Sequence, residues 1–124
     1  MIDLNAYWKA VFCQDRAKLP TFFAEDAKIY WHCTDEWFDV GGFVRVNCDY
    51  PGAWDGSLVK VIEGEPTVCV AEVREKGGTY SAHVTSIMTI KEDKIVRLDE
   101  YWADDGKAPK WRVKMGLSHP IKGE

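Results

Sequence analysis

Apolar residues at the start of the chain recur at helical spacing, and they predict one amphipathic helix. Asp3 stands directly before this segment and has the side chain of a helix N-cap. Pro20 either ends the helix or begins a second short one, because proline is tolerated in a first helical turn but not in a helix interior. The apolar stripe consists of Leu4, Trp8, Val11, Phe12 and Leu19.

Residues 27–33 alternate between two faces in the manner of a β-strand, with Ala27, Ile29 and Trp31 on one of them. A further helix is expected after Asp39, which has the side chain of an N-cap. That helix runs to about residue 50, where Pro51 and Gly52 stop it.

The second half of the chain predicts one strand after another. Helices followed by a meander of strands indicate a single α+β domain over residues 1–124. We expect a curved antiparallel sheet that wraps around the N-terminal helices and leaves an interior pocket. The expected strands are 56–63, 67–76, 79–91 and 94 to about 104, and the chain after residue 110 is left unassigned.

Two tight turns, at Gly77-Gly78 and Glu92-Asp93, allow the strand register to be calculated. The first turn places Glu72 opposite His83, and the second places His83 opposite Trp102. A slip of one residue in either turn would move the whole set to the opposite face. The predicted shared face consists of Val68, Val70, Glu72, Arg74, His83, Thr85, Ile87, Leu98, Glu100 and Trp102.

This face is apolar at one end and polar at the other, which is typical of a small-molecule site. Glu100 is the candidate general acid or base, His83 its partner, and Glu72 or Arg74 the orienting group. The alternative is that Arg74 pairs with a carboxylate and His83 only completes a buried hydrogen-bond network. The candidate substrate-binding residues are Trp31, Asn47, Tyr50, Trp54, Thr85 and Trp102.

Composition narrows the possible partners. The net charge is −4 and no basic run occurs, which argues against nucleic acid and anionic membranes. No apolar stretch is long enough for a membrane span, and the first residues do not form a signal peptide, so we expect a cytoplasmic protein. We expect neither a cofactor nor a metal.

Four cysteines are expected to be reduced and mostly buried, because their spacing matches neither a disulfide framework nor a zinc site. A weaker alternative is a metal site that combines Cys33 and His32 with Cys48 and His83.

Two segments carry a resemblance to a known family: residues 23–27, which lead into the first strand, and residues 94–102 in the last strand. With this order of elements, the chain resembles the SnoaL-like branch of the nuclear-transport-factor-two-like superfamily. The resemblance implies a cone-shaped α+β fold and a homodimer with one deep pocket in each subunit. Relatives in that superfamily include cyclases, isomerases and dehydratases that use acid–base side chains.

The resemblance does not carry one particular activity to this chain. In epoxide hydrolases of the superfamily, the catalytic positions correspond to Glu72, Arg74 and Glu100, but the order of acid and base differs. Trp31 and Cys33 stand where those enzymes have Tyr and Asn. The leading hypothesis is therefore a pocket for a small, largely apolar molecule, with cofactor-free isomerase, cyclase or dehydratase chemistry as an option. The alternative is a ligand-binding or dimerisation module without chemistry.

Overall fold

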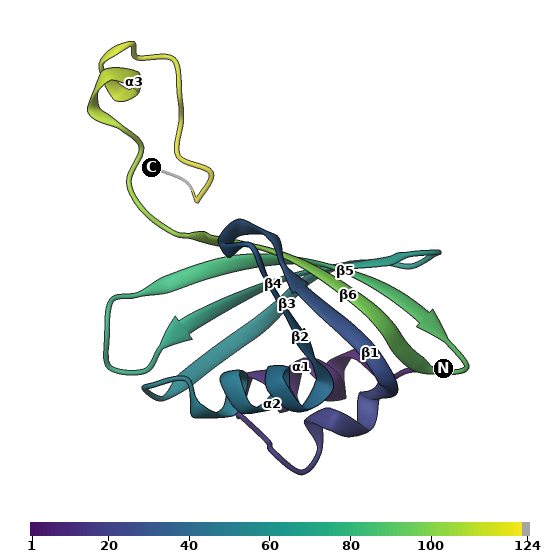
Figure 1. The fold of residues 1–124 in the computed structure, drawn as a ribbon. Helices are drawn as coiled ribbons and strands as arrows, with labels where there is room; N and C mark the ends of the chain where they lie inside the picture. The colour runs from purple at the N-terminus through teal and green to yellow at the C-terminus, as the bar shows by residue number, and fades with distance from the viewer. Residues whose placement is uncertain (123–124) are drawn as a thin grey trace.

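The computed structural model describes residues 1–122 and confirms an α+β architecture built on one curved sheet (Figure 1). The helices are α1 (Leu4–Phe12), α2 (Val40–Asp49) and α3 (Lys110–Lys114), with short 3-10 turns at Leu19–Phe22 and His32–Thr34. The strands are β1 (Phe23–Trp31), β2 (Glu36–Asp39), β3 (Trp54–Ile62), β4 (Thr67–Glu75), β5 (Ser81–Lys91) and β6 (Lys94–Asp104). The sequence pattern did not predict the short strand β2 or the 3-10 turn before it.

The strands follow the order β2-β1-β6-β5-β4-β3 in the sheet, with β1 and β6 parallel and the other neighbours antiparallel. The sheet curves over α1 and α2, which lie together on its concave side (Figure 1). We call this side the inner face of the sheet, and the opposite side the outer face.

Both predicted helix starts are confirmed by their capping bonds. The Asp3 carboxylate accepts a hydrogen bond from the Ala6 backbone N–H at 3.0 Å, and Asp39 accepts one from Gly42 at 2.7 Å. Pro20 lies in the first turn of the 3-10 segment, so it begins a second short helix. Fully buried side chains between helices and sheet form the core, namely Tyr7, Trp8, Leu19, Ile29, Phe43, Val84, Met88, Ile95 and Leu98.

The first predicted register is confirmed. Glu72 lies opposite His83 and Arg74 opposite Ser81. The loop itself is longer than a two-residue turn, because β4 ends at Glu75 and β5 begins at Ser81. The loop is longer by the same number of residues on the β4 side and on the β5 side, so the register is unchanged.

The second register is wrong by one residue. Lys91 lies opposite Lys94 as predicted, with Glu92 and Asp93 in the turn at φ angles of 51° and 63°. A β-bulge then leaves Val96 without a partner, since Ile90 faces Ile95 and Thr89 faces Arg97. Beyond the bulge, every side chain of β6 lies on the face opposite to the predicted one.

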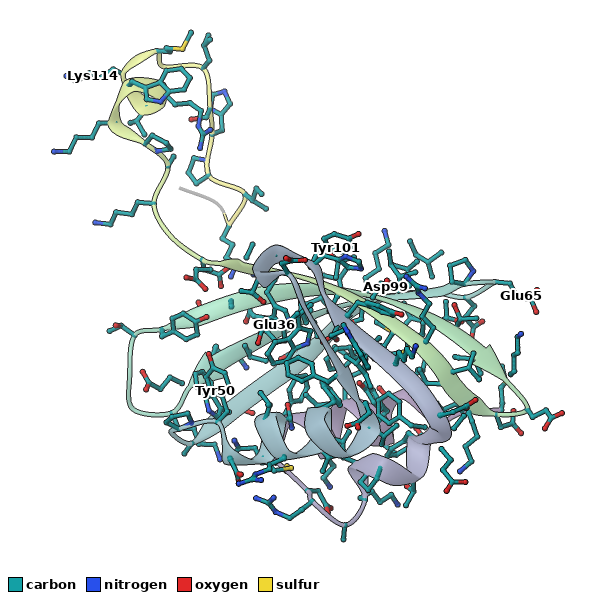
Figure 2. The ribbon with its side chains drawn as sticks, viewed as in Figure 1. Glu36, Tyr50, Glu65, Asp99, Tyr101 and Lys114 are labelled. Atoms are coloured by element: carbon teal, nitrogen blue, oxygen red, sulfur yellow. The ribbon has the colours of Figure 1, made fainter. Side chains whose placement is uncertain are left out.

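The bulge divides the predicted polar face into two. Glu100 lies opposite Ser86, and Trp102 opposite Val84, on the inner face. Glu72, Arg74, His83 and Thr85 lie on the outer face, together with Asp99 and Tyr101. Figure 2 shows Asp99 and Tyr101 on the side of the sheet away from the helices.

Residues 106–122 form an arm that follows β6 and projects away from the sheet (Figure 1). It contains α3 and exposes large apolar side chains, of which Trp111 is 65% and Leu117 71% exposed. No helix among residues 1–122 has the length and apolar character to cross a membrane.

Candidate functional site

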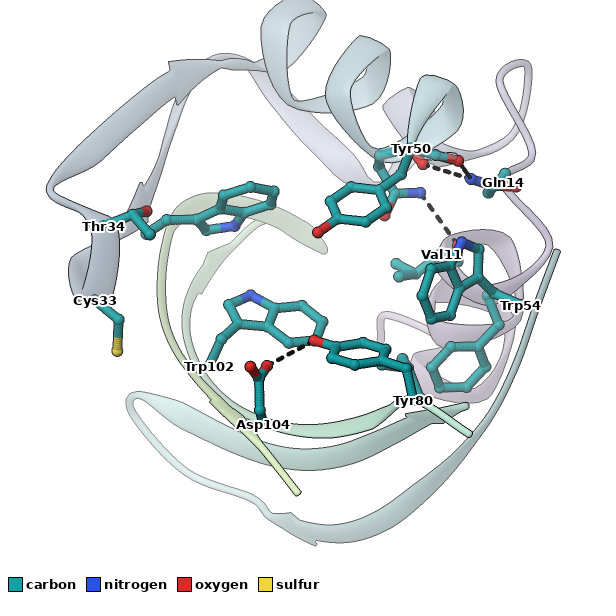
Figure 3. A pocket seen from close by; sticks show the side chains of 13 residues that line it. Val11, Gln14, Cys33, Thr34, Tyr50, Trp54, Tyr80, Trp102 and Asp104 are labelled. Atoms are coloured by element: carbon teal, nitrogen blue, oxygen red, sulfur yellow. Dashed lines mark hydrogen bonds between the residues drawn. The ribbon is translucent and has the colours of Figure 1, made fainter. Parts of the chain in front are cut away.

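A cavity of about 360 Å³ opens between the helices and the inner face of the sheet (Figure 3). The ends of α1 and α2 form one side of it, and the other comes from β1 with the turn after it, from β3, β4 and β6, and from the loop before β5. Its lining residues are Val11, Phe12, Gln14, Trp31, Cys33, Thr34, Asn47, Tyr50, Trp54, Val73, Tyr80, Trp102 and Asp104.

Aromatic rings dominate the wall and contact one another edge to face. Trp54 connects Tyr50 and Tyr80, with ring centroids 5.8 Å and 5.7 Å apart. Deeper in the fold, Trp31 contacts Trp102 at 6.4 Å. In Figure 3 the labelled rings of Tyr50, Trp54, Tyr80 and Trp102 surround the open space from different sides. Mutual edge-to-face contacts restrain these rings, so the wall is preorganised.

Two side-chain amides in the wall use their N–H groups to hold the helix ends. The Gln14 Nε2 group donates to the carbonyl oxygens of Asn47 and Tyr50 at 3.0 Å and 2.9 Å. The Asn47 Nδ2 group donates to the Val11 carbonyl at 3.1 Å. Because every one of these partners is an acceptor, each amide must place its nitrogen toward the backbone. The amide oxygens remain available as acceptors.

Asp104 is the charged residue of the cavity lining, and it is paired with Tyr80. The Tyr80 hydroxyl donates to Asp104 Oδ1 at 2.7 Å (Figure 3). This hydrogen bond, together with partial burial, raises the pKa of Tyr80 to about 12, so the phenol stays protonated at neutral pH.

Glu100 lies behind the aromatic wall and is only 2% exposed. Its carboxylate accepts hydrogen bonds from Trp31 Nε1 at 3.0 Å and from Ser86 Oγ at 2.5 Å. Burial raises the pKa of Glu100, although the hydrogen bonds from Ser86 and Trp31 and the nearby Trp102 indole oppose that shift. Trp31 therefore connects the carboxyl with the cavity, since its ring lines the cavity while its N–H contacts Glu100.

Buried polar atoms without a hydrogen-bond partner occur in the same part of the fold. Within residues 1–122 these are the Tyr7 hydroxyl and the indole N–H groups of Trp8 and Trp102. The charge of Glu100 contributes to the raised pKa of Tyr7, after the dominant effect of burial, so the two groups lie close enough to interact. Besides its bonds from Trp31 and Ser86, Glu100 therefore has two further donors in its neighbourhood, the Tyr7 hydroxyl and the Trp102 indole N–H.

The other predicted catalytic residues form a separate cluster on the outer face. Arg74 bonds the Glu72 carboxylate, and His83 Nε2 lies 3.2 Å from the other oxygen of Glu72. His83 Nδ1 lies 2.5 Å from Asp105 Oδ1. The Ser81 hydroxyl and then His83 lower the pKa of Asp105. The prediction that this group shares a face with Glu100 is wrong because of the bulge in β6.

The outer cluster also contains three groups of the kind that bind metals: Glu72, His83 and Asp105. Its geometry suits a salt-bridge network better. Each ring nitrogen of His83 already faces a different carboxylate, whereas one metal ion takes one ring nitrogen. Arg74 adds a positive charge next to Glu72. This arrangement matches the alternative in that Arg74 pairs with a carboxylate, but the network is not buried, because the side chains of Arg74 and His83 are each 42% exposed.

The structure does not bring together the residues of the alternative Cys/His metal site. His32 bonds the Asp99 carboxylate at 2.7 Å on the outer face, whereas Cys33 lies in the cavity lining. The expectation of mostly buried cysteines is wrong, because Cys13 and Cys33 are exposed and only Cys69 is fully buried. Cys13 and Cys33 each follow the end of a regular element, where the helical or strand pattern no longer determines burial.

Most predicted substrate-binding side chains do line the cavity. Their ligand contacts stay a prediction. Thr85 does not, because it lies on the outer face with His83. Sequence analysis missed Tyr80, Gln14 and Asp104. Tyr80 stands in the loop before β5, and the alternation that places Trp102 inside would have included Asp104. The five predicted residues that line the cavity are Trp31, Asn47, Tyr50, Trp54 and Trp102.

No protein-family model and no curated protein matches the sequence. Solved structures do match. A candidate ketosteroid isomerase from Kribbella flavida superimposes with a TM-score of 0.78 at 16% identity, over 95% of this chain and 86% of that one. A protein of unknown function from Burkholderia xenovorans, described as NTF-2 like, gives 0.76 at 22% identity, over 95% and 91% of the two chains.

A candidate polyketide cyclase from Sinorhizobium meliloti matches with a TM-score of 0.64 at 23% identity, over 78% of this chain and 91% of that one. The fold therefore occurs in proteins named for isomerase and cyclase chemistry. Sequence identities this low show that the fold is shared and do not show a shared activity. This chain has the cone-shaped α+β fold of the nuclear-transport-factor-two-like superfamily, as its resemblance predicts.

Proposed function

We propose that this protein binds a small, largely apolar molecule in the aromatic cavity. The observation that carries the proposal is the wall itself. Trp and Tyr rings from five separate strands and loops converge on one space of about 360 Å³, which falls within the size range of small-molecule sites. Figure 2 shows Tyr50 beside the end of α2, on the concave side of the sheet, where a ligand would enter.

A pair of substitutions on one strand tests this proposal. Val73 lines the cavity from the inner face of β4, whereas Val70 lies on the outer face of the same strand. We expect Val73→Trp to fill the cavity and abolish binding, and Val70→Trp to leave it intact. Native mass spectrometry of the purified protein, followed by calorimetry with a panel of small apolar molecules, measures the binding. Equal binding by both variants would place the ligand elsewhere.

A second candidate is proton-transfer chemistry that uses Glu100. It is favoured by a specific observation: a fully buried carboxyl whose pKa is raised by burial, with the unpartnered Tyr7 hydroxyl in the same region. Burial favours the protonated form of this carboxyl, which is the form that can donate a proton. His83 plays no part in this candidate mechanism, because it lies on the other side of the sheet.

Hydrogen exchange tests the second candidate without a known substrate. In deuterated water, a functional Glu100 would speed deuterium incorporation next to the carbonyl of a bound ketone. Glu100→Gln should abolish that acceleration, while Glu72→Gln on the outer face should not change it. If no ketone in the panel incorporates deuterium faster with the wild-type protein than in buffer, the cavity is a binding site without this chemistry.

A further inference from the structure

We propose that the cavity selects a small organic cation, that is, a ligand with a protonated or methylated ammonium group. This inference rests on the proposed function of the cavity as a binding site and names the chemical class of its ligand. Three independent features of the described residues support it: the aromatic walls, the sign of the charges, and the surplus of hydrogen-bond acceptors.

The aromatic wall supplies the first feature. Faces of Trp and Tyr rings carry negative electrostatic potential and attract ammonium groups, most strongly where water is excluded. Tyr50, Trp54 and Tyr80 lie in contact at the mouth, and Trp31 and Trp102 lie in contact deeper inside. Tyr80 donates its hydroxyl proton to a carboxylate, which makes its ring more electron-rich and a better partner for a cation.

The charges supply the second feature. Among the described residues that line the cavity, Asp104 is acidic and none is Lys, Arg or His. The chain's own cations contact aromatic rings elsewhere: Lys28 lies 5.2 Å from the Trp37 ring, and Arg97 lies 4.2 Å from the Tyr30 ring. No basic side chain of the lining competes for the cavity rings.

Hydrogen-bonding capacity supplies the third feature. The indole N–H of Trp31 donates to Glu100, and that of Trp54 donates to the Pro51 carbonyl at 3.1 Å. The Tyr80 hydroxyl donates to Asp104, so these three donors are occupied within the fold.

Among the described residues, two donors of the lining remain without a partner, the Trp102 indole N–H and the Tyr50 hydroxyl, and the available acceptors outnumber them. The amide oxygens of Gln14 and Asn47 remain available, because both amide nitrogens bond backbone carbonyls. The Asp104 carboxylate keeps accepting capacity beyond its bond from Tyr80. An anionic ligand would face this carboxylate and few available donors, whereas an ammonium ion meets rings and acceptors.

A series of ligands with the same shape and different charge tests the inference. Choline carries the quaternary ammonium group, neohexanol replaces its nitrogen with carbon, and neohexanoate has the same branched end with a negative charge. Isothermal titration of the intact chain measures all three. We expect choline to bind about tenfold or more tightly than neohexanol, and neohexanoate to bind most weakly.

Variants separate the charge effect from the ring effect. Asp104→Asn should weaken choline binding by about fivefold and leave neohexanol unchanged. Asp26→Asn is the matched control, because Asp26 is exposed on β1 and lies outside the lining. Trp54→Leu keeps an apolar side chain but removes a ring, so it should reduce the preference for choline over neohexanol. Tm measurements establish that each variant is folded.

Each outcome distinguishes this inference from the proposed function. If neohexanol or neohexanoate binds as tightly as choline, the site is confirmed as a pocket and the cation inference is overturned. The inference is equally overturned if other apolar molecules bind while choline does not. If neither the charge series nor the apolar panel binds, the proposed function itself fails and this inference fails with it.

Discussion

The two faces of the central sheet treat carboxylates in opposite ways, and adjacent residues of β6 show the contrast. Glu100 points inward, is 2% exposed, and has a raised pKa because burial disfavours its charge. Asp99 points outward, where the Arg97 guanidinium and then His32 lower the pKa of its carboxyl. One strand therefore carries a carboxyl whose charge is disfavoured by burial beside one whose charge is stabilised by its neighbours.

The difference indicates which face is suited to function. Acidic groups of the outer face pair with arginines of the same chain: Arg97 with Asp99, and Arg74 with Glu72. Glu100 accepts hydrogen bonds from Trp31 and Ser86 but forms no ion pair with a basic residue among residues 1–122, and it lies next to the cavity wall. A carboxyl with its charge uncompensated is the more responsive group, so the inner face is where a ligand or a proton has most effect.

The largest expected effect comes from changing the number of residues at the bulge that separates the two faces. Val96 is the extra residue there, since Ile95 and Arg97 pair with consecutive residues of β5. Deletion of Val96 should keep every later side chain on its present face and cost about 2 kcal/mol. Insertion of one Gly after Val96 has three possible outcomes: Glu100 and its inner-face neighbours turn outward, a second residue loops out, or Val96 enters regular pairing and β6 shifts by two residues along β5. The third outcome keeps the faces but disrupts the pairing of β6 with β1, so each of them costs stability.

Denaturant unfolding measures both variants. We expect the insertion to abolish cooperative unfolding while the deletion preserves it. An insertion variant as stable as the wild type would show that the bulge does not determine which residues face the cavity.

The same bulge explains why the fold was predictable and the site was only half predictable. Helix caps at Asp3 and Asp39 and the alternation of the strands are local signals, and the structure confirms them. Predicting which face each β6 side chain occupies required counting residues through the β5–β6 hairpin. One unpaired residue in that count moves every later side chain to the other face. No local signal marks Val96, because its environment depends on pairing with both β1 and β5. The homodimer likewise stays a prediction, since it depends on a second chain.

The next effect concerns two neighbouring residues of β5. Met88 is fully buried on the inner face, whereas Ile87 points outward and is half-buried. Met88→Ala should lower the free energy of unfolding by about 3 kcal/mol, since it removes core contacts and leaves a cavity. Ile87→Ala should cost about 1 kcal/mol. Urea titration compares the two, and equal losses would mean that the outer face is buried as well, for example against a second copy.

The smallest effect is the dependence of stability on pH, and its sign should differ between the two faces. Glu100 has a folded pKa above its ordinary value of 4.5, so its charge is less favourable in the folded state. Its contribution to stability is therefore greatest at low pH and is lost as the pH rises above that value. Asp99 has a folded pKa below its ordinary value of 3.8, so its contribution is present above 3.8 and is lost as the pH falls through the folded pKa.

Two isosteric variants separate these contributions. Glu100→Gln should make stability decline less as the pH rises from about 4.5 toward neutrality, because the neutral amide removes the buried charge. Asp99→Asn should instead flatten the acid limb below about 4, since it removes a carboxylate that Arg97 stabilises. Thermal unfolding across this pH range measures both limbs. If both variants changed the stability in the same pH range, the two carboxyls would have similar environments. Glu100 would then not differ from the carboxyls of the outer face.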